Sequence, residues 1–587
     1  MIIMHACVCA KIFGKKAALA VEKGGISVTV SYAKLRRVAF LLLALPSAVF
    51  AVGFLKWWIA LPVVALLCFA LYCALWKKDA EKAPAQDERV LKLPIRQMLV
   101  LFGIVMLWCF LSGLGNLYYQ TGDWGARNAI FRDLIRFNWP VIYASKNAAL
   151  VYYIGFWLPP ALVGKLFFSL GCTLEAAFAI GNIALLFWSA IHLYTVFLLL
   201  MLFLRADTKK RFFAVILIVV CFSGMDIVGS LLPRITLGMK VHSHLEWWTK
   251  YQFSSTASCL GWVFNQAIPA WLTVSCFLHE KQMRNYALLA VLCASAAPLP
   301  CVGVAGYMLA VLGVRTVRAV REKQIFALCR EVLSLQNLIS AAVLLPMWMV
   351  YYLSNMAVSA AANGVAPKPD YVAVVTVILM AVAAAVGAFL LRKHKREWYS
   401  LAIPAAAFLA AGLWGIVNTE LTMLYVGSFF LESGFYLLLL WWANRESLYY
   451  RVATVYVIIA PLIRLGTDFD FCMRVSIPTV FILMVLSARF LLENADCITR
   501  SGKKLGGRHL QRVLCIALIA VLAIGSFTLL AELRNGVVGV IKAGKLNAVN
   551  DTIITFDQHF GGAAAGADRN FIASDYGETF FFRYLAK

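Results

Sequence analysis

Long apolar runs dominate this chain and limit what it can fold into. From Val38 to Ala531 they follow one another at lengths of about 17 to 25 residues, and each is long enough to cross a bilayer as a helix. They lack the alternation of apolar and polar residues that a membrane β-barrel requires. The chain has 62% apolar and only 14% charged residues, whereas soluble domains have about a quarter charged. The sequence therefore predicts an all-α, polytopic helical membrane protein.

In a membrane protein, the net charge of +25 is explained by basic loops that face one side of the membrane. Lysines and arginines gather in alternate loops, as the positive-inside rule predicts, so we expect no nucleic-acid partner. Placing the basic N-terminal segment in the cytosol gives about thirteen crossings, a cytosolic N-terminus and an extracytoplasmic C-terminus. We expect a multi-pass protein of the cell membrane, surrounded by membrane lipids.

Loop charge also divides the chain into four parts. These are a cytosolic basic N-terminus (1–37), two helices at Val38–Phe54 and Trp57–Trp76 with a cytosolic loop (38–96), a transmembrane core (97–531) whose outer loop spans 115–149, and a short extracytoplasmic tail (532–587).

Two apolar stretches do not fit as single crossings. The first, Leu150–Gly171, carries Lys165 and is interrupted by Pro159 and Pro160, so we expect re-entrant or interfacial helices on the outer face. The second, Asn285–Val314, has basic residues on both flanks and a Pro-Leu-Pro centre. We expect it to form two half-length helices.

The outer loop at 115–149 holds the candidate catalytic residues. Asp123 and Asp133 lie beside two arginines, of which Arg127 is a candidate substrate-binding residue, just beyond an apolar run. A carboxylate held in a partly dehydrated pocket can act as the general base on an acceptor hydroxyl, and we expect one of the two to do so. The alternatives are a solvated acidic loop, or capping of an outer helix by Asp123.

A second outer loop carries candidate phosphate ligands. Arg464 and Arg474 flank the carboxylates Asp468 and Asp470. A guanidinium group suits a phosphate or diphosphate because it donates two parallel hydrogen bonds. The alternative is an internal pair between Arg474 and Asp470. The Asp-x-Asp spacing also permits a divalent cation, although so short a pattern defines no metal site.

A third group of candidates combines two histidines with acidic residues. His242, His244 and Glu246 suit substrate contact or proton transfer, but on a helix the i,i+2 spacing points the two rings apart, which disfavours a metal site. Asp226 and Glu432 lie within apolar segments. Carboxylates at such positions are candidate functional residues, and the alternative is pairing with a neighbouring helix.

Several soluble-enzyme chemistries lack their motifs in this sequence. It contains no phosphate-binding Gly-x-x-x-x-Gly-Lys-Ser/Thr loop, no His-Glu-x-x-His pair and no Gly-x-Ser-x-Gly elbow. Nor is there a soluble region long enough for a nucleotide-sugar-binding domain. Any sugar donor is therefore expected to come from the membrane.

The order of these features resembles that of GT-C type integral-membrane glycosyltransferases. The shared features are an early span, an outer loop with an acidic cassette (Gly122–Asp133), outer-face helices, many later spans and a short outer tail. The resemblance implies that Asp123, with Asp133 as the second candidate, is the base or positions a metal. It further implies an inverting transfer from a polyprenyl-phosphate-linked sugar to a saccharide, lipid or protein acceptor.

Two other functional classes remain open at this stage. Broken helices are also typical of transporters, so a flippase or transporter of lipid-linked saccharides or of another anionic solute is the competing prediction. The third class is an envelope-assembly scaffold without chemistry.

Overall fold

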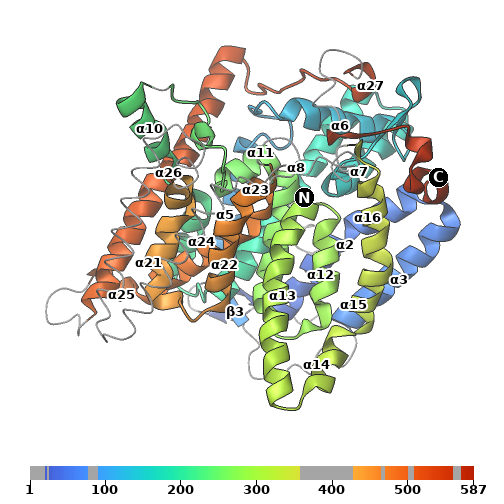
Figure 1. Ribbon diagram of the computed structural model, residues 1–587. Coiled ribbons are helices and arrows are strands. Elements are labelled where there is room, and N and C mark those ends of the chain that lie inside the picture. Colours follow the sequence, from blue (N-terminus) through green and yellow to red (C-terminus); the bar gives the residue numbers. More distant parts are fainter. Residues whose placement is uncertain are drawn as a thin grey trace.

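The computed structural model describes residues 20–22, 25–76, 90–238, 240–356, 427–463, 470–499, 508–559 and 570–587. This part of the chain is mostly helical, as expected, and its helices stack side by side around one continuous apolar core (Figure 1). Trp124, Trp157 and Trp348 are among the largest side chains buried in it.

In the described part of the chain, seven helices are long and apolar enough to cross a membrane. They are α2 (Tyr32–Phe54), α3 (Trp57–Leu75), α8 (Leu174–Phe203), α9 (Lys209–Cys221) with the start of α10 (Asp226–Leu237), α13 (Pro298–Arg321), the run of α15 (Leu335–Ile339), η6 (Ser340–Leu344) and α16 (Leu345–Leu353), and α26 (His509–Ala543). The expected total of about thirteen crossings stays a prediction, because the apolar region at 357–426 lies outside the described residues.

The other helices of the described residues complete the assembly, and most of them are shorter. They are α5 (Ile95–Leu111), α6 (Trp124–Arg136), η2 (Ala144–Lys146), η3 (Ile154–Trp157), α7 (Leu158–Ser169), η4 (Leu245–Trp248), α11 (Thr256–His279), η5 (Met283–Asn285), α12 (Tyr286–Ala294), α14 (Ile325–Val332), η7 (Phe429–Gly434), α21 (Phe435–Asn444), α22 (Leu448–Ile459), η8 (Ala460–Leu462), α23 (Asp470–Val475), α24 (Ile477–Glu493), α25 (Ala495–Thr499), α27 (Phe556–His559), η11 (Tyr576–Glu578) and η12 (Phe581–Leu585).

The prolines break the chain where the sequence predicts. The expected helices Val38–Phe54 and Trp57–Trp76 are confirmed as α2 and α3, with α2 beginning earlier, at Tyr32. The stretch Leu150–Gly171 forms the turn η3 and the 12-residue helix α7, which is too short to span. Its two prolines occupy the first turn of α7, where a missing backbone N–H leaves no hydrogen bond unmade.

The prediction of two half-length helices at Asn285–Val314 is wrong for the second one. The break falls between α12 and α13 as expected, and α12 has only 9 residues. However, α13 starts at the prolines and continues for 24 residues to Arg321, which is the length of a full span. Prolines in the first turn start a helix without shortening it, so the apolar run beyond them stays helical.

Two small antiparallel sheets make the all-α prediction incomplete. One joins β1 (Ala20–Glu22), β2 (Gly25–Ser31) and β3 (Val90–Pro94), and the other joins β4 (Ile142–Tyr143), β5 (Ala148–Leu150) and β6 (Ile572–Ser574). In the second sheet, Ala149 of β5 lies opposite Ala573 of β6. The strands of the second sheet have only two or three residues, too few for a period-two pattern. Strand β2 does alternate, with Ile26, Val28 and Val30 between polar residues, so for the first sheet the signal was present in the sequence and was missed.

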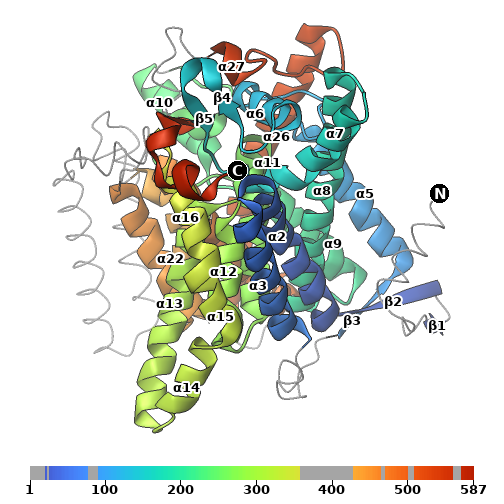
Figure 2. The same cartoon turned by 90° about the vertical axis from the view of Figure 1, so that its right-hand side faces the viewer.

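The predicted outer loop and the tail lie together at one end of the helix stack. This end, called the upper end here, carries α6, α7, α10 and α27, whereas α14, α25 and β3 lie at the opposite, lower end (Figure 1). Figure 2 shows β4 and β5 beside the C-terminal helices at the upper end. Pairing of β5 with β6 joins the loop to the tail directly. The two segments therefore share one face, as the crossing count requires, while the side of the membrane stays a prediction.

Candidate functional site

Helix α6 places the acidic cassette inside the upper end of the protein. Its first residue, Trp124, is buried, donates a hydrogen bond to the Gly261 carbonyl of α11 (2.9 Å) and stacks on Phe264 (ring centroids 5.1 Å apart). On the same helix, Ile130 and Leu134 are completely buried. These apolar contacts hold α6 against the spanning helices, so its polar side chains have fixed positions.

Asp123 lies at the start of α6 and pairs with Arg127. Arg127 Nη2 is 3.0 Å from Asp123 Oδ2, one helical turn away. The carboxylate of Asp123 makes no capping hydrogen bond to the backbone N–H groups of α6, so the expected alternative role as a helix cap is not observed.

The second predicted loop supplies a matching pair. Arg474 Nη2 lies 3.0 Å from Asp470 Oδ2, so the expected internal pair is confirmed. The Arg474 guanidinium also lies 5.7 Å from the ring centre of Tyr153, whose ring stacks on that of Tyr152 with centroids 4.7 Å apart. Arg464 and Asp468, the other candidates in this loop, lie outside the described residues. The Asp-x-Asp pattern is therefore described only at Asp470.

These two pairs meet in one place, called the arginine cluster here: Asp123, Arg127, Tyr152, Tyr153, Asp470 and Arg474. Burial lowers the pKa of Arg127, and the charge of Arg474 lowers it further against the effect of Asp123. Burial likewise opposes the charge of Arg474, but Asp470 and the phenol groups of Tyr152 and Tyr153 outweigh it and raise the pKa of Arg474. Both guanidinium groups therefore remain charged near each other.

The cluster is polarised, with its positive groups inside and its negative groups outside. The arginine side chains are 7% and 15% exposed, whereas Asp123 and Asp470 are 57% and 36% exposed. Arg127 Nη1 and Arg474 Nε are buried and have no hydrogen-bond partner. Buried N–H groups without acceptors are costly, so they favour an anionic ligand that supplies the missing oxygens.

Asp133, the second candidate base, has a different environment. It is fully buried, and its Oδ2 accepts hydrogen bonds from the Tyr143 hydroxyl (2.8 Å) and from the Phe556 backbone N–H (3.1 Å). Burial raises its pKa to about 6, although both hydrogen bonds act in the opposite direction. Asp133 thus connects α6 to β4 and to the tail, and it lies away from the exposed face where Asp123 stands.

The third group of candidates forms a second site on the other part of the upper end, the carboxylate cluster: Asp226, His244, Glu246, Glu432 and Glu532. His244 Nδ1 lies 2.7 Å from Glu532 Oε1, and its Nε2 lies 3.8 Å from Glu246 Oε2. Burial alone lowers the pKa of His244, but the hydrogen bond with Glu532 and the charge of Glu246 raise it overall. Burial raises the pKa of Glu246.

Trp248 connects the two intramembrane carboxylates of this cluster. Its Nε1 lies 3.4 Å from Asp226 Oδ1 and 3.1 Å from Glu432 Oε1. Asp226 starts α10, at the break within the span that α9 begins, and Glu432 lies in the π-helical turn η7. Irregular turns within apolar helices often mark functional positions.

The two predicted histidines lie in a loop, so the helix-based argument from their spacing does not apply, and both rings contact Trp247. The His242 ring lies 6.2 Å from the exposed Trp247 ring, whereas His244 is buried. Among the described residues, no three His, Cys, Asp or Glu side chains are arranged to hold a metal ion.

Sequence analysis missed three contributors to these sites. Tyr152 and Tyr153 were assigned to an apolar stretch, and Glu532 was recognised only as the start of the tail. Glu532 also accepts a hydrogen bond from Trp262 Nε1 (3.3 Å). Glu532 lies within the long apolar helix α26, and an acidic residue at the end of such a run was a usable signal. No sequence pattern indicated the two tyrosines.

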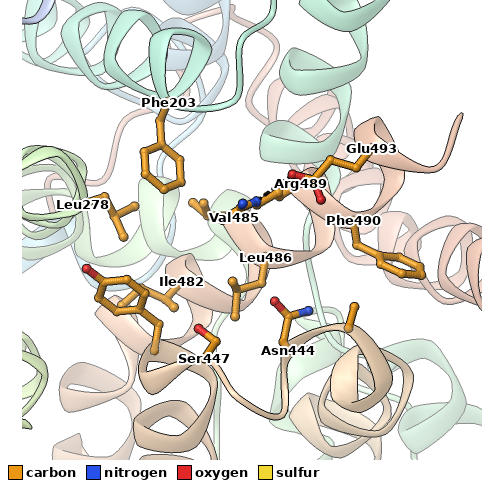
Figure 3. Close-up of a pocket in the computed structure, with 12 residues that line it drawn as sticks. Phe203, Leu278, Asn444, Ser447, Ile482, Val485, Leu486, Arg489, Phe490 and Glu493 are labelled. Atoms are coloured by element: carbon orange, nitrogen blue, oxygen red, sulfur yellow. Dashed lines mark hydrogen bonds and ion pairs between the residues drawn. The ribbon is translucent and has the colours of Figure 1, made fainter. Parts of the chain in front are cut away.

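A cavity of about 210 Å³ lies elsewhere, between the ends of α8, α21, α22 and α24. Figure 3 shows Arg489 beside Glu493 at its edge, with Phe203, Leu278 and Ile482 on the apolar side. Arg489 Nε is 2.8 Å from Glu493 Oε1, and both side chains are more than half exposed. None of the predicted site residues lines this cavity.

Comparison of the chain with family models, with curated proteins and with solved structures gave no match, so the sites must be interpreted from their own chemistry.

Proposed function

We propose that the protein is a membrane glycosyltransferase that moves a sugar from a polyprenyl-phosphate-linked donor to an envelope acceptor on the outer face of the membrane. The observation that carries the proposal is the arginine cluster. It brings the acidic cassette of the first predicted outer loop beside the arginine of the second, with buried N–H groups still lacking acceptors.

The two arginines would hold the donor phosphate. Arg127 and Arg474 each keep one or more N–H groups for a ligand after pairing with their aspartates. A phosphate monoanion or dianion offers several oxygens to such donors, and each charge-assisted hydrogen bond of this kind stabilises a complex by about 1.5 to 3 kcal/mol. The stacked rings of Tyr152 and Tyr153 lie beside Arg474, where a sugar ring attached to that phosphate would pack.

Asp123 would act as the general base. Its carboxylate is exposed and one helical turn from Arg127, so an acceptor hydroxyl can reach it while the donor phosphate is bound. As the hydroxyl oxygen attacks the anomeric carbon, its proton passes to Asp123 and the bond from that carbon to the phosphate oxygen breaks. The polyprenyl phosphate leaves with its negative charge stabilised by the arginines, and the anomeric configuration inverts.

An activity assay tests the proposal. The purified protein would be incubated with a panel of radiolabelled polyprenyl-phosphate-linked hexoses and with membranes from cells that lack the protein, and labelled product would be measured. We expect transfer with at least one donor, and a fall of about 10²- to 10⁴-fold in Asp123→Asn. Asp133→Asn is the matched control, since its carboxylate is buried away from the exposed face.

Two results would contradict this assignment. Full activity in Asp123→Asn, with loss in Asp133→Asn, would move the base to Asp133. Full activity in both variants would remove the cassette from the mechanism.

A transporter or flippase of lipid-linked saccharides or another anionic solute is the second candidate, and the carboxylate cluster favours it. Asp226 and Glu432 lie within apolar helices, and ionisable groups at such positions often belong to proton or ion pathways. Transport of intact donor across proteoliposome membranes, without release of polyprenyl phosphate, would support this candidate over transfer.

A further inference from the structure

Asp226 and Glu432 form a buried carboxylate pair with unequal partners. Asp226 is completely buried, and its Oδ2 accepts hydrogen bonds from the hydroxyls of Ser223 and Thr528, each at 2.7 Å. Its other oxygen accepts the longer bond from Trp248. Three donors for one carboxylate are typical of an ionised group.

Glu432 receives far less stabilisation for a negative charge. Its Oε1 accepts one hydrogen bond, from Trp248, and its Oε2 is buried without a partner. This Oε2 packs against Gly224, because a methyl group at that position would come within 2.6 Å of it. An ionised oxygen held against the backbone without a donor is strongly destabilised, whereas a protonated one is itself a donor.

Among the described residues, the acidic groups around the pair outnumber the one histidine near it. The titratable groups facing the pair are Glu246 from the α10–α11 connection, Tyr436 of α21 and Cys472 of α23. Beyond Glu246 lie His244 and, on α26, Glu532. In the described part of the chain, no lysine or arginine forms an ion pair with Asp226, Glu246 or Glu432.

We propose that Asp226 and Glu432 form a proton-binding site within the membrane domain, with the proton on Glu432 at neutral pH and Trp248 bridging the two groups. Both carboxylates have an oxygen within 3.4 Å of the same indole nitrogen, so two negative charges would lie close together in a medium of low dielectric. One shared proton removes that repulsion, and the three donors on Asp226 determine which member stays ionised. The inference does not depend on the proposed function.

Infrared spectroscopy tests the site directly in the full-length protein. A protonated carboxylic acid has a carbonyl stretching band separate from those of carboxylates and amides, and the band shifts when deuterium replaces the proton. The protein would be measured at pH 7 in a maltoside detergent, which has no carbonyl group. We expect this band in the wild type and a loss equivalent to about one carboxylic acid group in Glu432→Gln.

Glu493→Gln is the matched control, because this carboxylate is exposed and pairs with Arg489. We expect its spectrum to keep the full band. Absence of the band from the wild type at pH 7 would overturn the proposal without any variant. A band unchanged in folded Glu432→Gln would also overturn it, as would failure of that variant to fold, since glutamine has the shape of the neutral acid.

Discussion

The arginine cluster and the carboxylate cluster differ in how their charges and hydrogen bonds are balanced. In the arginine cluster the formal charges balance, because Asp123 and Asp470 each accompany one arginine, but buried N–H groups are left without acceptors. In the carboxylate cluster, His244 accompanies four acidic groups, and the charges themselves do not balance. The first arrangement calls for a ligand with oxygens, and the second calls for protons.

The two clusters differ in this way although adjacent residues of α11 contact the start of α6 and the carboxylate cluster. Gly261 of α11 accepts the hydrogen bond from Trp124 at the start of α6, while the next residue, Trp262, donates to Glu532 of the carboxylate cluster. Although α11 contacts both places, no ion pair joins the two sets among the described residues. Such separation costs folding stability, and proteins commonly accept that cost at functional sites.

Changing Arg474 to lysine should produce the largest effect. Lysine keeps the charge but loses the planar set of donors, so the affinity for polyprenyl phosphate should fall about 10- to 100-fold. Binding would be measured in detergent with polyprenyl phosphate, and with the uncharged polyprenol for comparison. Arg489→Lys is the control, because Arg489 makes the same i,i+4 pair on an exposed surface.

If the Arg474–Asp470 pair is only structural, the outcome differs. Arg474→Lys would then bind the phosphate as the wild type does, and Asp470→Asn would lower thermal stability as much as Arg474→Ala. If Arg127→Ala and Arg474→Ala both bind polyprenyl phosphate as the wild type does, the arginine cluster does not bind this phosphate.

Gly229→Ala should disturb the carboxylate cluster alone. A methyl group on Gly229 would overlap the Trp248 ring, which bridges Asp226 and Glu432. We expect a loss of about 1 to 3 kcal/mol of stability, as for other overpacked positions, with phosphate binding unchanged. Thermal unfolding measures the first and the binding assay the second. Gly103→Ala is the control, because no atom lies within 4 Å of its added methyl group.

Asp133→Asn tests whether a buried carboxylate outside the carboxylate cluster also holds a proton. Burial raises the pKa of Asp133 from 3.8 to about 6, so the folded state binds the proton more tightly than the unfolded state. Its stabilising contribution is complete below pH 4 and is lost as the pH rises through about 6, a total change of about 3 kcal/mol. Unfolding temperatures at pH 5 and pH 8 should differ less in Asp133→Asn than in the wild type. An equal pH dependence in both proteins would assign it to other groups.

His244→Gln should have the smallest effect. The raised pKa of His244 means that its imidazolium stabilises the fold fully below its unfolded pKa of about 6.5, and that this stabilisation is lost as the pH rises through the higher folded value. Removing it should flatten the stability curve above pH 6.5. Glu532→Gln should act in the same direction, because the carboxylate that raises the pKa is gone. If the dependence of stability on pH is unchanged in both variants, the group that binds the proton is not His244.

Features set by local sequence were predictable. Run length identified α2, α3 and α8, and the proline positions identified the breaks before α7 and α13. Pairing of β5 with β6 puts the loop of the cassette beside the tail, as the crossing count requires, while the count itself and the side of the membrane stay predictions. Run length and loop charge are properties of single segments, which the bilayer selects directly.

Contacts between distant segments were not predictable from the sequence. Nothing around Asp133 indicated that the Phe556 N–H would bury it, and nothing around His244 indicated Glu532. The length of α13 was also predicted wrongly, because the helix after the Pro-Leu-Pro break was expected to have half the length of a span, and it has 24 residues. Such outcomes depend on which helices become neighbours, and a single sequence carries no periodic signal for that.

The sheet that joins β5 to β6 has a consequence for the order in which the protein is made. Asp133, Tyr143 and β5 are synthesised early, but the Phe556 N–H and β6 that complete their hydrogen bonds arrive only after the last long helix, α26. Until then the edge of β5 is open and the carboxylate of Asp133 lacks one donor. The acidic cassette is therefore among the first segments to leave the ribosome, and its surroundings are among the last to form.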